Sequence, residues 1–251
     1  MIKVLSKIIA KRSIITAEFR RVGAFMRIKT LAFAGDLYPA TCAQMRLLLG
    51  KFETFLKENI LEPSLLEKRA QVIIVPYGSY EEMGWVSFFA HRLLGANPLI
   101  ERLLLLSPWE GEEERWGWRC EVDSYALLSR ELPALKHSGL PEALRTLPLL
   151  PLETPTPKSE VHLPLLSYHF KGKTPSLLEL FYAPSRLLEW STLLGEISLD
   201  PHTGIILVAN LESNSLTPLS SWLASLGEPL LFPHQGNYSL AYPLQAQRNL
   251  S

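Results

Sequence analysis

The chain has few cysteines, no net charge and no long apolar run, and each of these absences excludes a class of protein. Only Cys42 and Cys120 are cysteines, too few for a disulfide framework or a thiolate metal cage, so we expect two small core residues in a cytoplasmic protein. A formal net charge of 0 argues against nucleic acid or an anionic membrane as a partner. No apolar stretch is long enough to predict a membrane span. With 251 residues, 47% of them hydrophobic, the chain can bury one large core, and we expect one domain.

The first 25 residues differ from the rest in charge. They hold six basic residues and Glu18 alone, which gives +5, and the remaining residues therefore carry −5. This composition is typical of an organelle-targeting peptide, of a helix that lies on a membrane surface, or of a disordered or mis-started extension. We favour an extension before a start at Met26, because strand-like sequence begins directly after that methionine. We therefore divide the chain into residues 1–25 and a domain of residues 26–251.

Short apolar runs bounded by glycine or proline predict buried strands, and longer runs with a 3.6-residue period predict helices. The sequence alternates between the two, which is typical of an α/β domain with a mostly parallel sheet and helices on both faces. The proline-rich residues 141–164 predict a long extended connection, and nothing is predicted after Glu228. The predicted strands are Ile28–Ala34, Val72–Pro76, Arg102–Ser107, an edge strand Trp116–Val122, Leu177–Tyr182 and Gly204–Asn210. The predicted helices are Cys42–Asn59 capped by Thr41, Glu82–Leu94, Ser124–Lys136 capped by Asp123, Glu160–Phe170, Ser185–Glu196 and Pro218–Leu226.

Ligands of such a sheet bind where the loops leave the carboxyl ends of its strands. The loops after Ala34, Val75, Leu106 and Ala209 are therefore expected to converge on one cleft. No dinucleotide fingerprint, P-loop, nucleophile elbow or zinc-protease motif occurs, so no motif supports those chemistries. The six histidines are scattered, and His162 is interpreted as a helix-start residue paired with a backbone group rather than as a catalytic one.

The short motifs around this cleft occur in a recognisable order. The chain reads Ala34-Gly35-x-x-Tyr38-Pro39, Val75-Pro76-x-x-x-Tyr80-x-x-x-Gly84, Leu106-x-Pro108, Val122-Asp123, Glu160-Val161-His162-Leu163-Pro164 and the strand Ile206–Asn210. From roughly Ala34 to Ser215 this order resembles the Memo family, whose members are also called the B protein of the AmmeMemoRadiSam system. The resemblance implies a fold similar to the class III extradiol dioxygenases (LigB-like) and a metal site in the cleft.

The family's metal ligands are not retained. Tyr77 stands where the family has its first ligand histidine, and Glu110 stands where it has the second. Glu160 is kept, but the histidine three residues before it is Pro157. In the last motif Asn210 and Ser213 replace an aspartate and a histidine, while Glu212 occupies the variable position that supplies a third ligand in some relatives. Borderline metals favour imidazole, so the loss predicts a degenerate site.

We therefore expect no cofactor, no metal and no catalysis, in a pseudoenzyme that binds a protein or small molecule through the cleft. Tyr77, Tyr80, Trp85 and Trp109 would form an aromatic wall, or would only fill the space left by the metal site. The alternative is an enzyme with an altered carboxylate ligand set, Glu110 and Glu212, for a hard cation. The family association makes radical-SAM and AMMECR-type proteins candidate partners. The candidate cleft residues are Tyr38, Tyr77, Tyr80, Trp109, Glu110, Glu160, His162, Asn210, Glu212 and Ser213.

Overall fold

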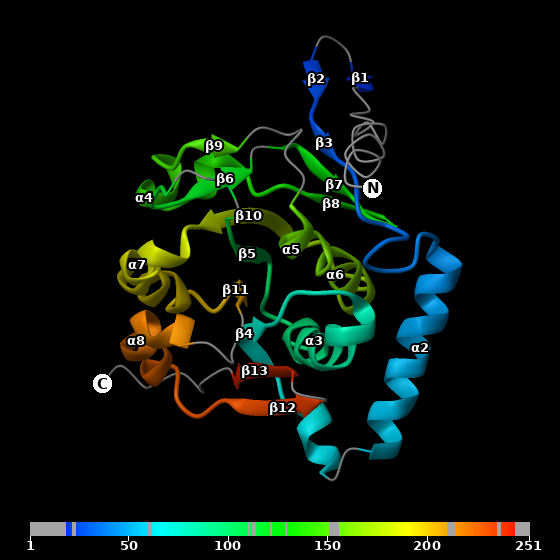
Figure 1. Ribbon diagram of the computed structural model, residues 1–251. Helices are drawn as coiled ribbons and strands as arrows, with labels where there is room; N and C mark the ends of the chain where they lie inside the picture. The colour runs from blue at the N-terminus through cyan, green and yellow to red at the C-terminus, as the bar shows by residue number, and fades with distance from the viewer. Residues whose placement is uncertain are drawn as a thin grey trace, which may run out of the picture.

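An eight-stranded sheet runs through the molecule in the order β12-β13-β4-β11-β5-β10-β6-β9 (Figure 1). Its four central strands, β4, β11, β5 and β10, are parallel to one another, whereas β13 and β6 pair with them in the antiparallel direction. This computed structural model describes residues 19–21, 24–59, 62–109, 111, 114–120, 122–128, 130–150, 156–209, 214–234 and 237–243. The strands are β4 (Ala70–Val75), β5 (Arg102–Pro108), β6 (Trp118–Cys120), β9 (Leu149–Leu150), β10 (Ser176–Tyr182), β11 (Thr203–Val208), β12 (Leu230–His234) and β13 (Asn237–Pro243).

The central strands are apolar throughout because helices cover both faces of the sheet (Figure 1). Alternate residues point to opposite faces, so Ile73 and Val75 pack under α3 while Val72 and Ile74 pack under α7. This confirms the α/β class predicted from the sequence. The helices are α2 (Cys42–Asn59), α3 (Tyr80–Gly95), α4 (Glu142–Arg145), α5 (Pro157–Glu160), α6 (Leu163–His169), α7 (Leu188–Ser198) and α8 (Ser220–Ser225), with 3-10 turns at η1 (Pro63–Glu67), η2 (His137–Gly139), η3 (Pro184–Arg186) and η4 (Asn214–Leu219).

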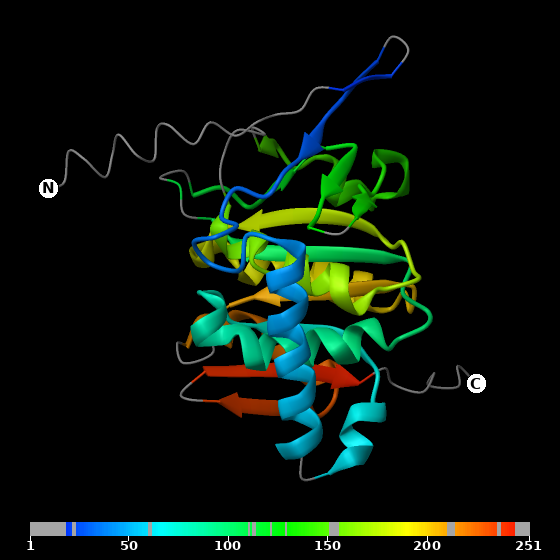
Figure 2. The ribbon, with the colours of Figure 1, turned by 90° about the vertical axis from the view of Figure 1, so that its right-hand side faces the viewer.

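Helix α2 forms an outer layer against α3 (Figure 2). Its bounds match the prediction, and Thr41 caps it by accepting a hydrogen bond from the Gln44 amide, 3.2 Å from Oγ1. Phe52 of α2 packs against Gly84 of α3, where an added Cβ would lie 2.8 Å from the Phe52 ring. Glycine at position 84 therefore permits the close contact between the two helices.

The predicted helix Ser124–Lys136 is wrong. Its residues form two antiparallel strands, β7 (Ser124–Ala126) and β8 (Glu131–Pro133), beside β3 (Ile28–Lys29). Tyr125 and Leu132 face each other in this pairing and both are fully buried, and burial of this pair outweighs the helical pattern. Asp123 caps no helix but accepts a hydrogen bond from the Arg27 amide at 2.7 Å.

Other boundaries also differ from the prediction. The first strand keeps only its first two residues, and the chain then turns through the loop before Pro39. The residues after Glu228, for which nothing was predicted, add β12 and β13 to the sheet. Leu240 of β13 pairs with Ile74 of β4. Residues 1–18 lie outside the described part of the chain, and Phe19–Arg21 (β1) and Ala24–Met26 (β2) form a hairpin.

Candidate functional site

The loops after β4, β5 and β11 leave the same edge of the sheet, because these strands are parallel. They carry several of the predicted cleft residues. Tyr77 follows β4 and Trp109 follows β5, whereas Glu110, Asn210, Glu212 and Ser213 lie outside the described residues. The described part of this edge, which we call the strand-end site, consists of Tyr77, Trp109 and the start of α5.

At the strand-end site a lysine covers Tyr77. The Tyr77 ring is 39% exposed, and the Lys158 ammonium lies 4.2 Å from its centroid. This is a cation–π arrangement between two neighbouring side chains of the strand-end site.

Trp109 fills most of the remaining space. Its amide donates to the Tyr182 carbonyl at 2.8 Å, and its ring packs on Trp118 and Phe181 with centroids 5.9 and 6.2 Å away. The space left has a volume of about 20 Å³ and is lined by Ser107, Pro108, Trp109, Thr156, Pro157, Lys158 and Phe181. That volume holds roughly one water molecule. The described part of the strand-end site is therefore filled by side chains.

Tyr80 and Trp85 do not join this wall. The Tyr80 hydroxyl is buried and donates to the Val161 carbonyl at 2.8 Å. Trp85 packs against Phe52 and Phe55 of α2, with ring centroids 4.2 Å away in both cases. Both residues lie on α3, from which Tyr80 contacts the residue after α5 and Trp85 contacts α2.

Glu160 holds the loop after β3 in place. Its carboxylate accepts hydrogen bonds from the Ala32 amide at 2.9 Å, the Phe33 amide at 2.7 Å and the Tyr38 hydroxyl at 2.6 Å. Burial raises the pKa of the Glu160 carboxyl, and the three donors oppose that effect. Burial and the neighbouring Glu160 also raise the pKa of Tyr38, which keeps the phenol protonated as a donor. Glu160 and Tyr38 thus act together as a structural clamp.

We expect Glu160→Gln to destabilise the fold by about 2–4 kcal/mol, because an amide group cannot accept all three hydrogen bonds and leaves a buried donor unpaired. Urea unfolding followed by circular dichroism measures the change. Glu142→Gln is the matched control, since Glu142 is 80% exposed and contacts only Arg145 at 3.4 Å in the described structure. Equal stability of Glu160→Gln and wild type would contradict the clamp.

His162 lies at the start of α6, as predicted, but its ring makes no backbone hydrogen bond to the described residues. Both ring nitrogens are buried without a partner. The ring is stacked on His91 of α3 with centroids 5.2 Å apart and planes 9° apart. His91 Nδ1 lies 2.7 Å from the Ser87 carbonyl, so it carries the proton and Nε2 is left as an unpaired acceptor. Burial lowers the pKa of His91 to about 4 and that of His162 well below its usual value.

The sequence analysis missed a buried ion pair between Lys29 and Glu179. The Lys29 ammonium lies 2.6 Å from Glu179 Oε2, and the Glu179 side chain is fully buried in the middle of β10. Ser159 donates to Glu179 Oε1 at 2.7 Å, and Lys29 also donates to Thr156 at 2.7 Å. The sequence did indicate a buried charge that needs a partner, because Glu179 is the only charged residue in the apolar run Leu177–Tyr182.

Beside this pair, burial and the Glu179 carboxylate raise the pKa of the Cys120 thiol to about 12. The thiol is therefore protonated at neutral pH and a poor nucleophile. This agrees with the expectation that Cys120 is a small core residue, for it is 3% exposed.

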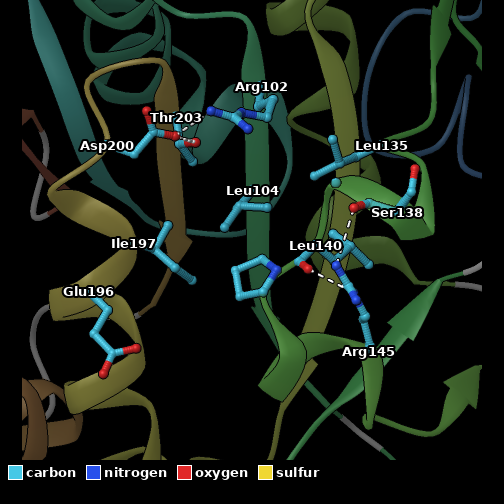
Figure 3. A pocket seen from close by; sticks show the side chains of 12 residues that line it. Arg102, Leu104, Leu135, Ser138, Leu140, Arg145, Glu196, Ile197, Asp200 and Thr203 are labelled. Atoms are coloured by element: carbon cyan, nitrogen blue, oxygen red, sulfur yellow. Dashed lines mark hydrogen bonds and ion pairs between the residues drawn. The ribbon is translucent and has the colours of Figure 1, made fainter.

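A larger cleft lies at the opposite edge of the sheet, at the amino ends of β5 and β11 (Figure 3). It has a volume of about 320 Å³. Arg102 pairs with Asp200 at 2.6 Å on one side, and Arg145 donates to the Leu140 carbonyl at 2.8 Å on the other. Leu104, Leu140 and Ile197 lie between them. Both guanidinium groups are thus held by partners within the chain.

Among the described residues, no three histidine, cysteine, aspartate or glutamate side chains are grouped closely enough to hold a metal ion. No helix in the described ranges combines the length and the apolar character needed to cross a membrane. Comparison with protein-family models finds no match. Comparison with curated proteins finds no significant match either.

Proposed function

We propose that this chain is a Memo-like protein with a degenerate metal site, which binds a partner at the strand-end site and does not catalyse a reaction. The observation that carries the proposal is the Lys158 ammonium, 4.2 Å from the ring of Tyr77. Tyr77 takes the position of a metal-binding histidine in the resemblance, and the Lys158 ammonium lies against the face of its ring. A phenol ring covered in this way offers no imidazole nitrogen to a borderline metal.

The exposed Tyr77 ring and the Lys158 ammonium give the site a chemistry suited to binding. Tyrosine supplies a large apolar face with a polar tip, a combination that is enriched at protein interfaces. The described part leaves about 20 Å³ of free space, which favours a protein surface over an enclosed small molecule. Radical-SAM and AMMECR-type proteins are the candidate partners that the resemblance suggests.

The metal content of the purified protein tests the loss of metal chemistry. We expect a substoichiometric amount of divalent metal by mass spectrometry, and no tight binding of Zn²⁺, Mn²⁺ or Mg²⁺ by calorimetry. Tyr77→His alone should not create tight binding, because the other family ligands are also replaced. Stoichiometric metal that disappears in Glu110→Ala or Glu212→Ala would instead support the carboxylate-site enzyme and overturn the proposal.

The binding role has a separate test. Lys158→Ala should weaken binding of a radical-SAM or AMMECR-type protein in calorimetry, whereas Lys171→Ala should not. Lys171 is a matched control because its ammonium lies 3.7 Å from the Tyr168 ring, in the same arrangement on another part of the surface. Equal affinity of the wild type and Lys158→Ala would place the contact elsewhere.

A further inference from the structure

Arg119 of β6 is a buried cation without a counter-charge in the described part of the chain. Its side chain makes no hydrogen bond and no ion pair there, Nε is enclosed without a partner, and the residue is only 8% exposed. Other partly buried arginines behave differently. Arg102 pairs with Asp200, and Arg130 donates to the Lys173 carbonyl at 2.6 Å. A mostly buried guanidinium without a counter-charge is destabilising, so an anion that reaches Arg119 would stabilise the fold.

The guanidinium of Arg119 lines a cavity of about 370 Å³ between β6, β10 and residues 133–137. We call it the Arg119 cavity. The terminal nitrogens of Arg119 make no hydrogen bond within the described chain and, unlike Nε, are not fully enclosed, so an anion can reach them. The cavity shares no lining residue with the strand-end site, and it neighbours the cleft of Figure 3 through Leu135.

Among the described residues that line the Arg119 cavity, Arg27, Arg119 and Lys136 are positively charged and Asp123 is negatively charged. Asp123 accepts a hydrogen bond from the Arg27 amide at 2.7 Å and lies 3.9 Å from Arg27 Nε. The apolar part of the described lining includes Val122 and Leu178. The described lining therefore combines the Arg119 side chain with an apolar wall.

We propose that the Arg119 cavity binds the phosphate monoester of a small organic molecule. The planar fork of a guanidinium matches two phosphate oxygens. A phosphate monoester carries about −1.5 to −2 charges near pH 7 and three acceptor oxygens, so the Arg119 guanidinium attracts it more strongly than a carboxylate, which carries one charge. The volume lies within the usual range of small-molecule pockets, about 300–1,000 Å³, and the apolar wall suits the organic group. This site is independent of any partner at the strand-end site.

Thermal unfolding of the full chain in phosphate-free buffer tests the proposal, with phenyl phosphate, inorganic phosphate and benzoate as probes and sodium chloride at equal ionic strength as the blank. At about 100 times its Kd, phenyl phosphate should raise the Tm by roughly 5–10 °C. Inorganic phosphate and benzoate should raise it less. Arg119→Met should abolish the rise, and Arg145→Met, in the neighbouring cleft, should retain it.

Arg119→Met has a second expected effect, because it removes a buried unpaired charge. Without any probe its Tm should rise by about 2–5 °C. A lower Tm would show that the guanidinium is already paired within the chain and would overturn the proposal. No response of the wild type, an unchanged response of Arg119→Met, or a stronger response to benzoate than to phenyl phosphate would do the same. If Arg119→Met does not fold, Arg119→Lys should bind phenyl phosphate at least about 10-fold more weakly, since it lacks the fork, and unchanged affinity would overturn the proposal.

Discussion

Lys29→Met is expected to destabilise the protein by about 3–5 kcal/mol, because it leaves the Glu179 carboxylate charged and unpaired in the core. Glu179 is fully buried and the ammonium of Lys29 lies 2.6 Å from it. Burial lowers the pKa of Lys29, but the Glu179 carboxylate more than offsets this, so the net pKa is raised and the lysine is charged. Urea unfolding at neutral pH measures the loss.

The double variant Lys29→Met/Glu179→Leu separates the ion pair from simple packing. We expect it to be more stable than either single variant, because no charge is then left alone in the core. The hydroxyl of Ser159, which donates to Glu179, still loses its acceptor, so recovery is incomplete. Lys57→Met is the control, since Lys57 is 64% exposed and Glu53 keeps its pair with Arg92, so the loss is expected to be about 1 kcal/mol or less. A double variant as unstable as the sum of the singles would show that the two side chains do not stabilise each other.

Lowering the pH from 6.5 to 4 is the second change expected to have a large effect, because it lowers the free energy of unfolding. Burial lowers the pKa of His91 to about 4 and lowers the pKa values of His162 and His169 well below the usual range. The unfolded chain, whose histidines titrate near pH 6.5, therefore binds more protons than the folded chain in this interval. The contribution of these histidines to the free energy of unfolding is fully present above about pH 6.5. It is lost as the pH drops, by on the order of 3 kcal/mol for His91 alone.

His162→Leu tests the origin of this pH dependence. The leucine removes one buried titrating ring and two unpaired ring nitrogens. We expect unchanged or higher stability at pH 7.5 and a shallower loss of stability toward pH 4.5, both measured by urea unfolding at a series of pH values. His202→Gln is the control variant, because His202 is 44% exposed. A wild type whose stability is constant down to pH 4.5 would contradict the prediction.

The central elements could be predicted because their signals are local. Helix Cys42–Asn59 has an N-terminal cap at Thr41 and an apolar face repeated every three to four residues, and its bounds are those predicted. Strands β4, β5, β10 and β11 are apolar runs ended by polar or proline residues, and each lies within about two residues of its predicted position. Order and alternation then predict that these four strands are parallel and that helices cover both faces of the sheet.

The candidate site was less predictable, because its contacts join distant parts of the chain. The residues after β4 and β5 were expected to share one edge, and they do so. That Lys158 of α5 covers Tyr77, and that Trp109 fills the space beside it, depends on where α5 packs. Glu160 was expected in the cleft, but its carboxylate is turned to the loop after β3, where it accepts three hydrogen bonds.

Periodicity and capping act over a few residues, so the amino-acid sequence was enough to predict the α/β class, the central strands and the long helix. Three features appear only in the folded chain: Ser124–Pro133 is a hairpin, β13 pairs with β4, and Lys29 meets Glu179 across 150 residues. These choices depend on burial against partners far along the chain, which no local pattern records. The same holds for Arg119, an ordinary edge-strand arginine in the sequence that becomes a buried cation beside a cavity once β6 joins β10.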